Sequence, residues 1–260
     1  MYLRPRQLLY GALINNIIRI PIAMGMELDL KFHPASNSSR TGVLVLPGGG
    51  YEHISADKEG TKPAEWLVSH DINAWVLTYT VADASHPAPI YPVPQNEALE
   101  AVRQIRESNK VDNLGIWGFS AGGHLAAVTA TDHDADLDFA ILAYPVISMV
   151  PGITHPGSRH NLIGDNATAD IEHSLSAETR VDEKTPPTFL FHTANDGTVP
   201  IQNTLGFTGA LAKYKVPFEV LILPDGPHGI GLALDNERLT WTGELERWLG
   251  GFDFNITNTK

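Results

Sequence analysis

The chain has 260 residues, of which 43% are hydrophobic and 18% charged, a composition that is typical of a folded globular protein and excludes a disordered or fibrous one. Its formal net charge of −12 argues against nucleic acid or an anionic membrane surface as the main partner, because both repel an acidic protein. The absence of cysteine excludes disulfide bonds, thiolate metal sites and cysteine nucleophiles. No apolar run reaches the ~20 residues that a membrane-spanning helix needs.

The N-terminal segment, residues 1–25, resembles a secretory signal peptide in that Arg4 and Arg6 precede an apolar run. Asn15 and Asn16 interrupt that run, and no small-x-small cleavage site clearly follows it. The segment is therefore interpreted as an N-terminal extension that forms a helix packed on the domain. We expect a cytoplasmic protein, with secretion as the alternative, and leave self-association into a homo-oligomer open.

Segments typical of strands alternate with segments typical of helices along the rest of the chain. Residues 26–32 alternate apolar and polar side chains, which predicts a half-exposed antiparallel edge strand. The other expected strands are continuous apolar runs, typical of buried parallel strands, over residues 42–47, 73–80, 114–119, 139–146, 188–193 and 218–224. Helices are expected over residues 62–70, 95–109, 121–131, 202–214 and 237–249.

This alternation predicts an α/β fold with a mostly parallel central sheet flanked by helices. We expect a single domain over residues 1–260. Residues 147–187, rich in Pro, Gly, His and Ser, form one long insertion between two core strands. Because open α/β sheets bind ligands at the carboxyl ends of their strands, this loop insertion is expected to border a site there.

The pattern G-x-S-x-G, from Gly118 to Gly122, lies between an expected strand and an expected helix. This is the setting of a nucleophile elbow, in which glycines allow a sharp turn that exposes the serine hydroxyl. The alternative is an ordinary strand-to-helix turn in which Ser120 caps the helix. The motif alone does not decide between the two interpretations.

Two further residues favour the catalytic interpretation of Ser120. A serine hydroxyl needs a base to take its proton and an acid to orient that base, and after such an elbow they follow in the order Asp or Glu, then His. Asp196 follows the expected strand 188–193, and His228 lies in a glycine-flanked loop after the strand 218–224. Taken singly, Asp196 also suits a turn and His228 a surface loop. Their order and topology together predict a Ser120–His228–Asp196 triad.

The sequence Leu-Pro-Gly-Gly-Gly-Tyr, residues 46–51, follows the first buried strand, where such a site needs an oxyanion donor. We expect an oxyanion hole formed by Gly49 and Gly50 together with Ala121, the residue after the serine. The alternative is a phosphate-binding loop, but the segment lacks the G-K-[ST] ending of a P-loop and the G-x-G-x-x-G spacing of a dinucleotide site. No cofactor is therefore expected.

The segment 131–138, Thr-Asp-His-Asp-Ala-Asp-Leu-Asp, resembles a metal site at first sight. It has no i, i+4 pair of ligands that matches a zinc site, because neither residue four positions from His133 is a usual zinc ligand, and it lacks the glycine and the terminal glutamate of an EF-hand. It is interpreted as a solvated acidic loop, so no metal is expected.

A few aromatic and histidine side chains are candidates for lining the pocket. Tyr51 and Tyr144 are candidates for substrate binding, since an aromatic ring stacks on a sugar or limits the length of an acyl group, although each also suits the core. His155 and His160 lie in the insertion and are candidates for its pocket-facing side. His124, one turn after Ser120, is expected to pack on the sheet or on the wall of the site.

Six motifs, in this order, resemble those of α/β-hydrolase esterases of the acetylxylan esterase and bifunctional feruloyl/acetylxylan esterase type: LPGGGY, GFSAGGHLAA, YPVISM, HPGSRHNLIGD, TPPTFLFHTANDGTVP and GPHGIGLA. The likeness covers most of residues 42–250. It implies an α/β-hydrolase fold in which Ser120 is the nucleophile, Asp196 the acid and His228 the base, with the glycine loop and the residue after the serine as oxyanion donors. The family commonly has a second acid beside the catalytic one, where this sequence has Asn195.

The resemblance implies a serine carboxylesterase that hydrolyses short-chain acyl esters, typically acetyl groups on sugars or xylo-oligosaccharides, through an acyl-enzyme and without a cofactor. The alternatives are a hydrolase of another bond (a peptidase, amidase or lactonase) and a non-catalytic α/β-hydrolase that binds a ligand. The complete triad makes the non-catalytic alternative the weakest. The expected partner is a small-molecule or oligosaccharide ester, with neither nucleic acid nor a membrane.

Overall fold

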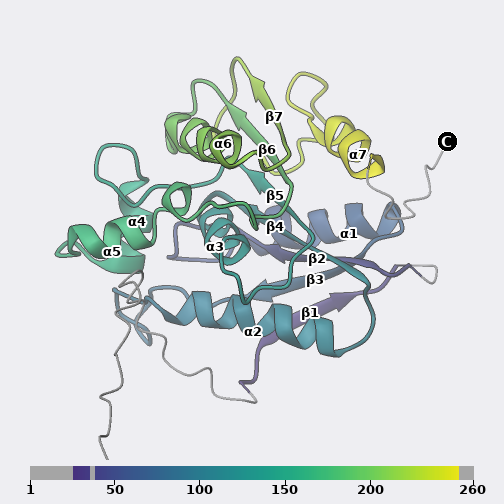
Figure 1. The fold of residues 1–260 in the computed structure, drawn as a ribbon, viewed down its shortest axis with the longest axis horizontal. Helices are drawn as coiled ribbons and strands as arrows, with labels where there is room; N and C mark the ends of the chain where they lie inside the picture. The colour runs from purple at the N-terminus through teal and green to yellow at the C-terminus, as the bar shows by residue number, and fades with distance from the viewer. Residues whose placement is uncertain (1–25, 36–38, 252–260) are drawn as a thin grey trace, which may run out of the picture.

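The computed structural model describes residues 26–35 and 39–251 (Figure 1). The expected N-terminal extension, residues 1–25, lies outside these described residues. Within them, no helix combines the length and the apolar character that crossing a membrane requires.

A seven-stranded sheet forms the centre of the fold, in the order β1-β3-β2-β4-β5-β6-β7, which runs from bottom to top in Figure 1. The strands are β1 (Asp29–His33), β2 (Thr41–Leu46), β3 (Asn73–Thr78), β4 (Asn113–Phe119), β5 (Phe139–Ala143), β6 (Thr188–Thr193) and β7 (Phe218–Leu223). The edge strand β1 pairs antiparallel with β3, and all other pairs are parallel. The predicted α/β fold with a mostly parallel sheet and an antiparallel edge strand is confirmed.

Helices cover both faces of the sheet. They are α1 (Lys62–Ser69), α2 (Val93–Glu107), α3 (Ser120–Ala130), α4 (Pro156–Ile163), α5 (Ala169–Ser174), α6 (Gln202–Tyr214) and α7 (Thr242–Gly250). Leu44 and Leu46 of β2 belong to one apolar cluster with residues of α2, α3 and α6. Val43 and Val45 belong to a second cluster with residues of α1 and α7. Burial on both faces explains why the inner strands read as continuous apolar runs.

The structure differs from the expected elements in a few places. β5 ends at Ala143, because Tyr144 has a positive φ of 37° that turns the chain out of the sheet. The insertion contains α4, α5 and a 3₁₀ turn at Ala177–Thr179, which its mixed composition did not indicate. A π-helical segment, Ala56–Thr61, precedes α1, and α7 begins at Thr242, later than expected.

Candidate active site

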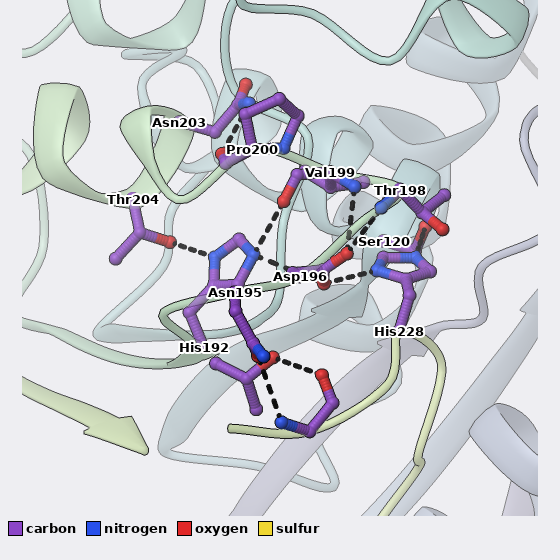
Figure 2. Close-up of polar contacts among 12 residues, drawn as sticks. Ser120, His192, Asn195, Asp196, Thr198, Val199, Pro200, Asn203, Thr204 and His228 are labelled. Carbon is purple, nitrogen blue, oxygen red and sulfur yellow. Dashed lines mark hydrogen bonds and ion pairs between the residues drawn. The ribbon is translucent and has the colours of Figure 1, made fainter. Parts of the chain in front are cut away.

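The three residues of the expected triad each follow the carboxyl end of a parallel strand. Ser120 comes directly after β4, Asp196 shortly after β6 and His228 shortly after β7. Because the carboxyl ends of parallel strands share one edge of the sheet, the three side chains meet there. Ser120 Oγ lies 2.8 Å from His228 Nε2, and His228 Nδ1 lies 2.7 Å from Asp196 Oδ2 (Figure 2). The structure thus brings together the three residues that the sequence singled out.

The turn at Ser120 has the geometry of a nucleophile elbow. Ser120 has a positive φ of 53°, a conformation that non-glycine residues rarely adopt and that here directs the hydroxyl towards His228. A Cβ atom at Gly118 would lie 2.2 Å from the carbonyl oxygen of Gly122, and one at Gly122 would lie 2.2 Å from that of Leu46. Both glycines are therefore needed for α3 to pack this closely on β2 and β4.

The partners of His228 fix the position of its proton. An ionised carboxylate only accepts hydrogen bonds, so Nδ1 carries the hydrogen and donates it to Asp196. The Nε2 atom then accepts the hydrogen bond of the Ser120 hydroxyl. This is the tautomer in which a histidine can take a proton from serine.

Asp196 is an ionised carboxylate in a buried place, with a side chain that is 1% exposed. Its Oδ1 accepts hydrogen bonds from the backbone N–H groups of Thr198 (2.8 Å) and Val199 (3.0 Å). Burial, the largest single influence, raises the pKa of Asp196, but the hydrogen bonds from His192, His228 and these two N–H groups together outweigh it and hold the pKa well below its usual range. The carboxylate therefore stays charged while it orients His228.

His192 supports Asp196 from the side opposite His228, as Figure 2 shows. Its Nε2 lies 3.0 Å from the carbonyl oxygen of Val199, which can only accept, so Nε2 carries a hydrogen. The same Nε2 lies 3.4 Å from Asp196 Oδ2, and Nδ1 pairs with the hydroxyl of Thr204 at 2.7 Å. Sequence reasoning missed this role, because the position of His192 inside an apolar strand gave no sign that it faces the acid.

The glycine loop lies directly against the nucleophile, since a Cβ atom at Gly48 would be 2.9 Å from the Cβ of Ser120. The N–H of Gly48 donates to Glu59 Oε2 at 3.0 Å. The N–H groups of Gly49 and Gly50 meet no acceptor among the described residues, and Ala121 is in the first turn of α3, where N–H groups lack an intrahelical acceptor. Three N–H groups without an acceptor among the described residues thus belong to the two segments that adjoin Ser120, and the expected oxyanion hole stays a prediction for them.

Glu59 is a buried carboxylate, 4% exposed, that connects two loops of the site. Its Oε1 accepts the hydroxyl of Tyr144 at 2.7 Å, and that hydroxyl accepts the N–H of Gly231 at 2.9 Å. Burial raises the pKa of Tyr144 well above its usual value and the charge of Glu59 raises it further, so the hydroxyl keeps its proton and donates. The chain of contacts joins the glycine loop, through Gly48, to the loop that carries His228. Glu59 gave no sequence signal, because its segment is polar throughout.

The two tyrosines expected to bind substrate lie in the core instead, Tyr51 at 0% and Tyr144 at 2% exposure. The hydroxyl of Tyr51 lies 2.8 Å from His124 Nδ1, and His124 Nε2 lies 2.7 Å from the carbonyl oxygen of Leu175. These contacts tie the glycine loop to α3 and to the insertion. Neither ring has a face free for a substrate, because tertiary packing encloses both.

Asn195, which stands where esterases of the type that the motifs resemble commonly have a second acid, fastens the loop that carries His228. Its Oδ1 accepts the N–H of Gly226 at 3.1 Å, and its Nδ2 donates to Asp225. The hydroxyl of Thr193 donates to the carbonyl oxygen of Gly226 at 2.9 Å. The amide therefore has a positioning role that a carboxylate beside Asp225 would not fill.

The insertion borders the glycine loop through α4, where Asn161 Nδ2 donates to the carbonyl oxygen of Gly50 at 2.9 Å. His155, at the start of α4, lies next to Gly50. His160 instead pairs with Asp165 in an exposed position. In the acidic loop, His133 pairs with Asp182 at 2.6 Å. No group of three or more His, Asp or Glu side chains is placed to hold a metal ion within the described ranges.

The amino-acid sequence of this chain matches a known protein family and several known proteins. Residues 94–251, which include the whole triad, match the prolyl oligopeptidase family. The endo-1,4-β-xylanase B of Butyrivibrio fibrisolvens is 35% identical over 219 residues, which cover 77% of this chain and 34% of the relative. An acetylxylan esterase of Xylanibacter ruminicola is 32% identical over 213 residues, which cover 78% of this chain and 43% of the relative. The chain thus spans less than half the length of these two relatives.

A solved structure matches over nearly its full length. The acetyl ester-xyloside bifunctional hydrolase of Caldicellulosiruptor lactoaceticus is 35% identical, with a TM-score of 0.81 over 93% of this chain and 95% of that one. The fold, the family match and these similarities agree with the resemblance found in the motifs. The chain therefore belongs to the prolyl oligopeptidase family, has the α/β-hydrolase fold and is related to the acetylxylan esterases.

Proposed function

We propose that the protein is a serine carboxylesterase that removes short acyl groups, above all acetyl, from sugars or xylo-oligosaccharides. The observation that carries the proposal is the continuous hydrogen-bond chain from Ser120 through His228 to the ionised Asp196. The named activities of the related acetylxylan esterase and acetyl ester-xyloside hydrolase support the choice of acyl group and alcohol.

In the first half of the reaction, Ser120 Oγ attacks the carbonyl carbon of the ester while His228 Nε2 takes the hydroxyl proton. The negative charge that develops on the carbonyl oxygen is stabilised by the N–H groups of Gly49, Gly50 and Ala121. Asp196 stabilises the imidazolium without taking its proton. The tetrahedral intermediate then breaks the bond to the alcohol, which leaves with the proton from His228, and the acyl group stays on Ser120.

In the second half, a water molecule attacks the acyl-enzyme. His228 takes a proton from this water, and the same donors stabilise the second oxyanion. The bond to Ser120 Oγ breaks, His228 returns the proton to Oγ, and the carboxylic acid leaves. The protein's own residues thus suffice for every proton transfer in the two steps.

The replacement Ser120→Ala tests the nucleophile. It removes the attacking oxygen, so we expect hydrolysis of p-nitrophenyl acetate to fall by about 10⁴-fold or more while the melting temperature changes little. Labelling of the wild-type protein, but not of the variant, by a fluorophosphonate probe is the matched control. Turnover retained by the variant would contradict the assignment of Ser120 as the nucleophile. A wild-type protein that reacts with neither p-nitrophenyl acetate nor the fluorophosphonate probe would favour the non-catalytic alternative.

A substrate panel tests the bond and the alcohol. Acetylated xylo-oligosaccharides and acetylated monosaccharides are expected to give a higher kcat/KM than esters of longer acids, lactones or peptide amides. A peptidase is the second candidate, because the matched family is named for an oligopeptidase. A preference for a peptide amide over every acetyl ester would select that candidate instead.

From the sequence we also propose that the protein is cytoplasmic, with secretion as the alternative, and that it can associate into a homo-oligomer. Cell fractionation and light scattering on the purified protein address these two points separately from the activity.

A further inference from the structure

His155 stands beside the glycine loop, on the part of the insertion that touches the site. It is the N-cap residue of α4, and its ring lies so close to Gly50 that a Cβ atom built there would be 3.8 Å from its Cε1. The hydrogen bond from Asn161 to the carbonyl oxygen of Gly50 holds α4 against the loop. His155 is thus fixed next to a residue expected to stabilise the oxyanion.

The contacts of His155 also determine which ring nitrogen carries the hydrogen. The backbone N–H of Ser158 lies 3.2 Å from Nδ1, and an N–H group can only donate, so Nδ1 is the acceptor. The Ser158 hydroxyl lies 2.9 Å from the same atom. The neutral ring must therefore carry its hydrogen on Nε2, and that N–H meets no acceptor in the part of the chain that the structure describes.

The ring is half-buried, and its charge state follows from its surroundings. Burial lowers the pKa of His155, the electrostatic interaction with His228 lowers it further, and Asp196 acts in the opposite direction. The influence of both triad residues agrees with a position at the site. At neutral pH His155 is therefore an uncharged side chain whose Nε2–H takes no part in the helix cap.

We propose that His155 is a substrate-binding residue whose Nε2–H donates a hydrogen bond to an oxygen of the alcohol part of the ester, such as a sugar hydroxyl or ring oxygen. The proposal rests on the proposed function. The carbonyl oxygen already has the donors of Gly49, Gly50 and Ala121, and an acetyl group has no other oxygen beyond the scissile bond. A fourth donor beside the loop is therefore available to the alcohol, and it favours alcohols that carry hydroxyl groups.

The cap and the donor can be separated by substitution. In His155→Asn the side-chain oxygen still accepts the N–H of Ser158, because asparagine is among the best N-cap residues. Its amide is too short to replace the Nε2–H donor. His155→Gln, with a longer amide, is expected to recover part of the lost binding. His160→Asn, an exposed position in the same helix, is the matched control.

The experiment compares kcat/KM on two substrates, an acetylated xylo-oligosaccharide and 1-naphthyl acetate, whose alcohol has no oxygen apart from the ester. For His155→Asn we expect kcat/KM on the sugar ester to fall about tenfold, mainly through KM, which corresponds to the loss of one hydrogen bond. On 1-naphthyl acetate we expect less than a twofold change, and the melting temperature should match that of the wild type. The control variant should resemble the wild type on both substrates.

An equal loss on both substrates, or no loss on either, would overturn the role of His155 while the esterase function stands. A wild-type protein that hydrolyses 1-naphthyl acetate but no acetylated sugar would overturn the proposed sugar substrate, and the role of His155 with it. The wild-type rates thus separate the failure of the proposed function from the failure of this inference.

Discussion

His124 is a buried histidine that holds its place by staying neutral. Its Nε2–H donates to the carbonyl oxygen of Leu175, which leaves Nδ1 to accept the hydroxyl of Tyr51. Burial, the largest influence, lowers the pKa of His124 from 6.5 to about 4. A proton on Nδ1 would break the bond with Tyr51 and place a charge in the core, so this residue makes the fold sensitive to acid.

We predict that the free energy of unfolding falls as the pH is lowered from about 6.5 to 4, and that His124 contributes to the fall. In this window the unfolded chain binds a proton at His124 that the folded chain does not, so acid favours unfolding. The loss in the free energy of unfolding due to His124 is on the order of 2 to 3 kcal/mol at pH 4.5. Urea unfolding at pH 7.5 and 4.5 measures the change in the free energy of unfolding.

The control for this prediction is His124→Gln, whose amide can still donate to Leu175 but does not titrate. Other groups titrate equally in both proteins, so the variant should lose less stability than the wild type between the two pH values. Equal losses in the two proteins would show that His124 does not take part in the acid response.

At the scale of elements, the π-helical segment Ala56–Thr61 determines how the loops of the site are held together. It places Glu59 where one carboxylate accepts the N–H of Gly48 and the hydroxyl of Tyr144. Gly48 belongs to the glycine loop, and Tyr144 is bonded to the loop after β7 through Gly231. π-helical segments frequently occur at functional sites, and here the segment fixes the distance between the two loops.

We predict that Glu59→Gln lowers kcat on 1-naphthyl acetate by about 10- to 100-fold, because a glutamine has one acceptor oxygen for two donors and the oxyanion loop loses its support. KM should change much less. Glu65→Gln, an exposed position in the neighbouring helix α1, is the matched control and should leave both constants unchanged. A glutamine variant at Glu59 with wild-type kcat would contradict the positioning role.

The elements that the sequence predicted best are those whose pattern is local. The apolar run of β6 and the helix α6 have the expected bounds, 188–193 and 202–214. The short helices α4 and α5 were not predicted, and α4 is held in place partly by a contact with a residue distant in the sequence, that of Asn161 with Gly50. The triad could be predicted from the sequence, because the order of the strands alone places its three residues. The burial of Tyr51 could not be predicted, because it depends on partners distant in the sequence.

At the scale of the whole molecule, the net charge of −12 determines how the rate depends on salt for a neutral and for a charged substrate. We predict that kcat/KM on a neutral acetylated xylo-oligosaccharide changes less than twofold between about 0.05 and 0.5 M NaCl, because the field of the protein does not act on an uncharged ligand. Initial rates over this range of salt concentration measure the dependence of kcat/KM on salt. A rate that rises steeply with salt would instead indicate an anionic substrate, whose approach the protein disfavours.

The two carboxylates that flank the site have a consequence for the end of the catalytic cycle. Asp196 and Glu59 both accept hydrogen bonds from uncharged donors, so the negative charge of each is left unbalanced by these contacts. An ester and its alcohol are neutral and enter or leave without an electrostatic cost. The acid released from the acyl-enzyme ionises to acetate, which these charges repel. The carboxylates that orient His228 and join the two loops of the site thus also hasten the departure of the acid product.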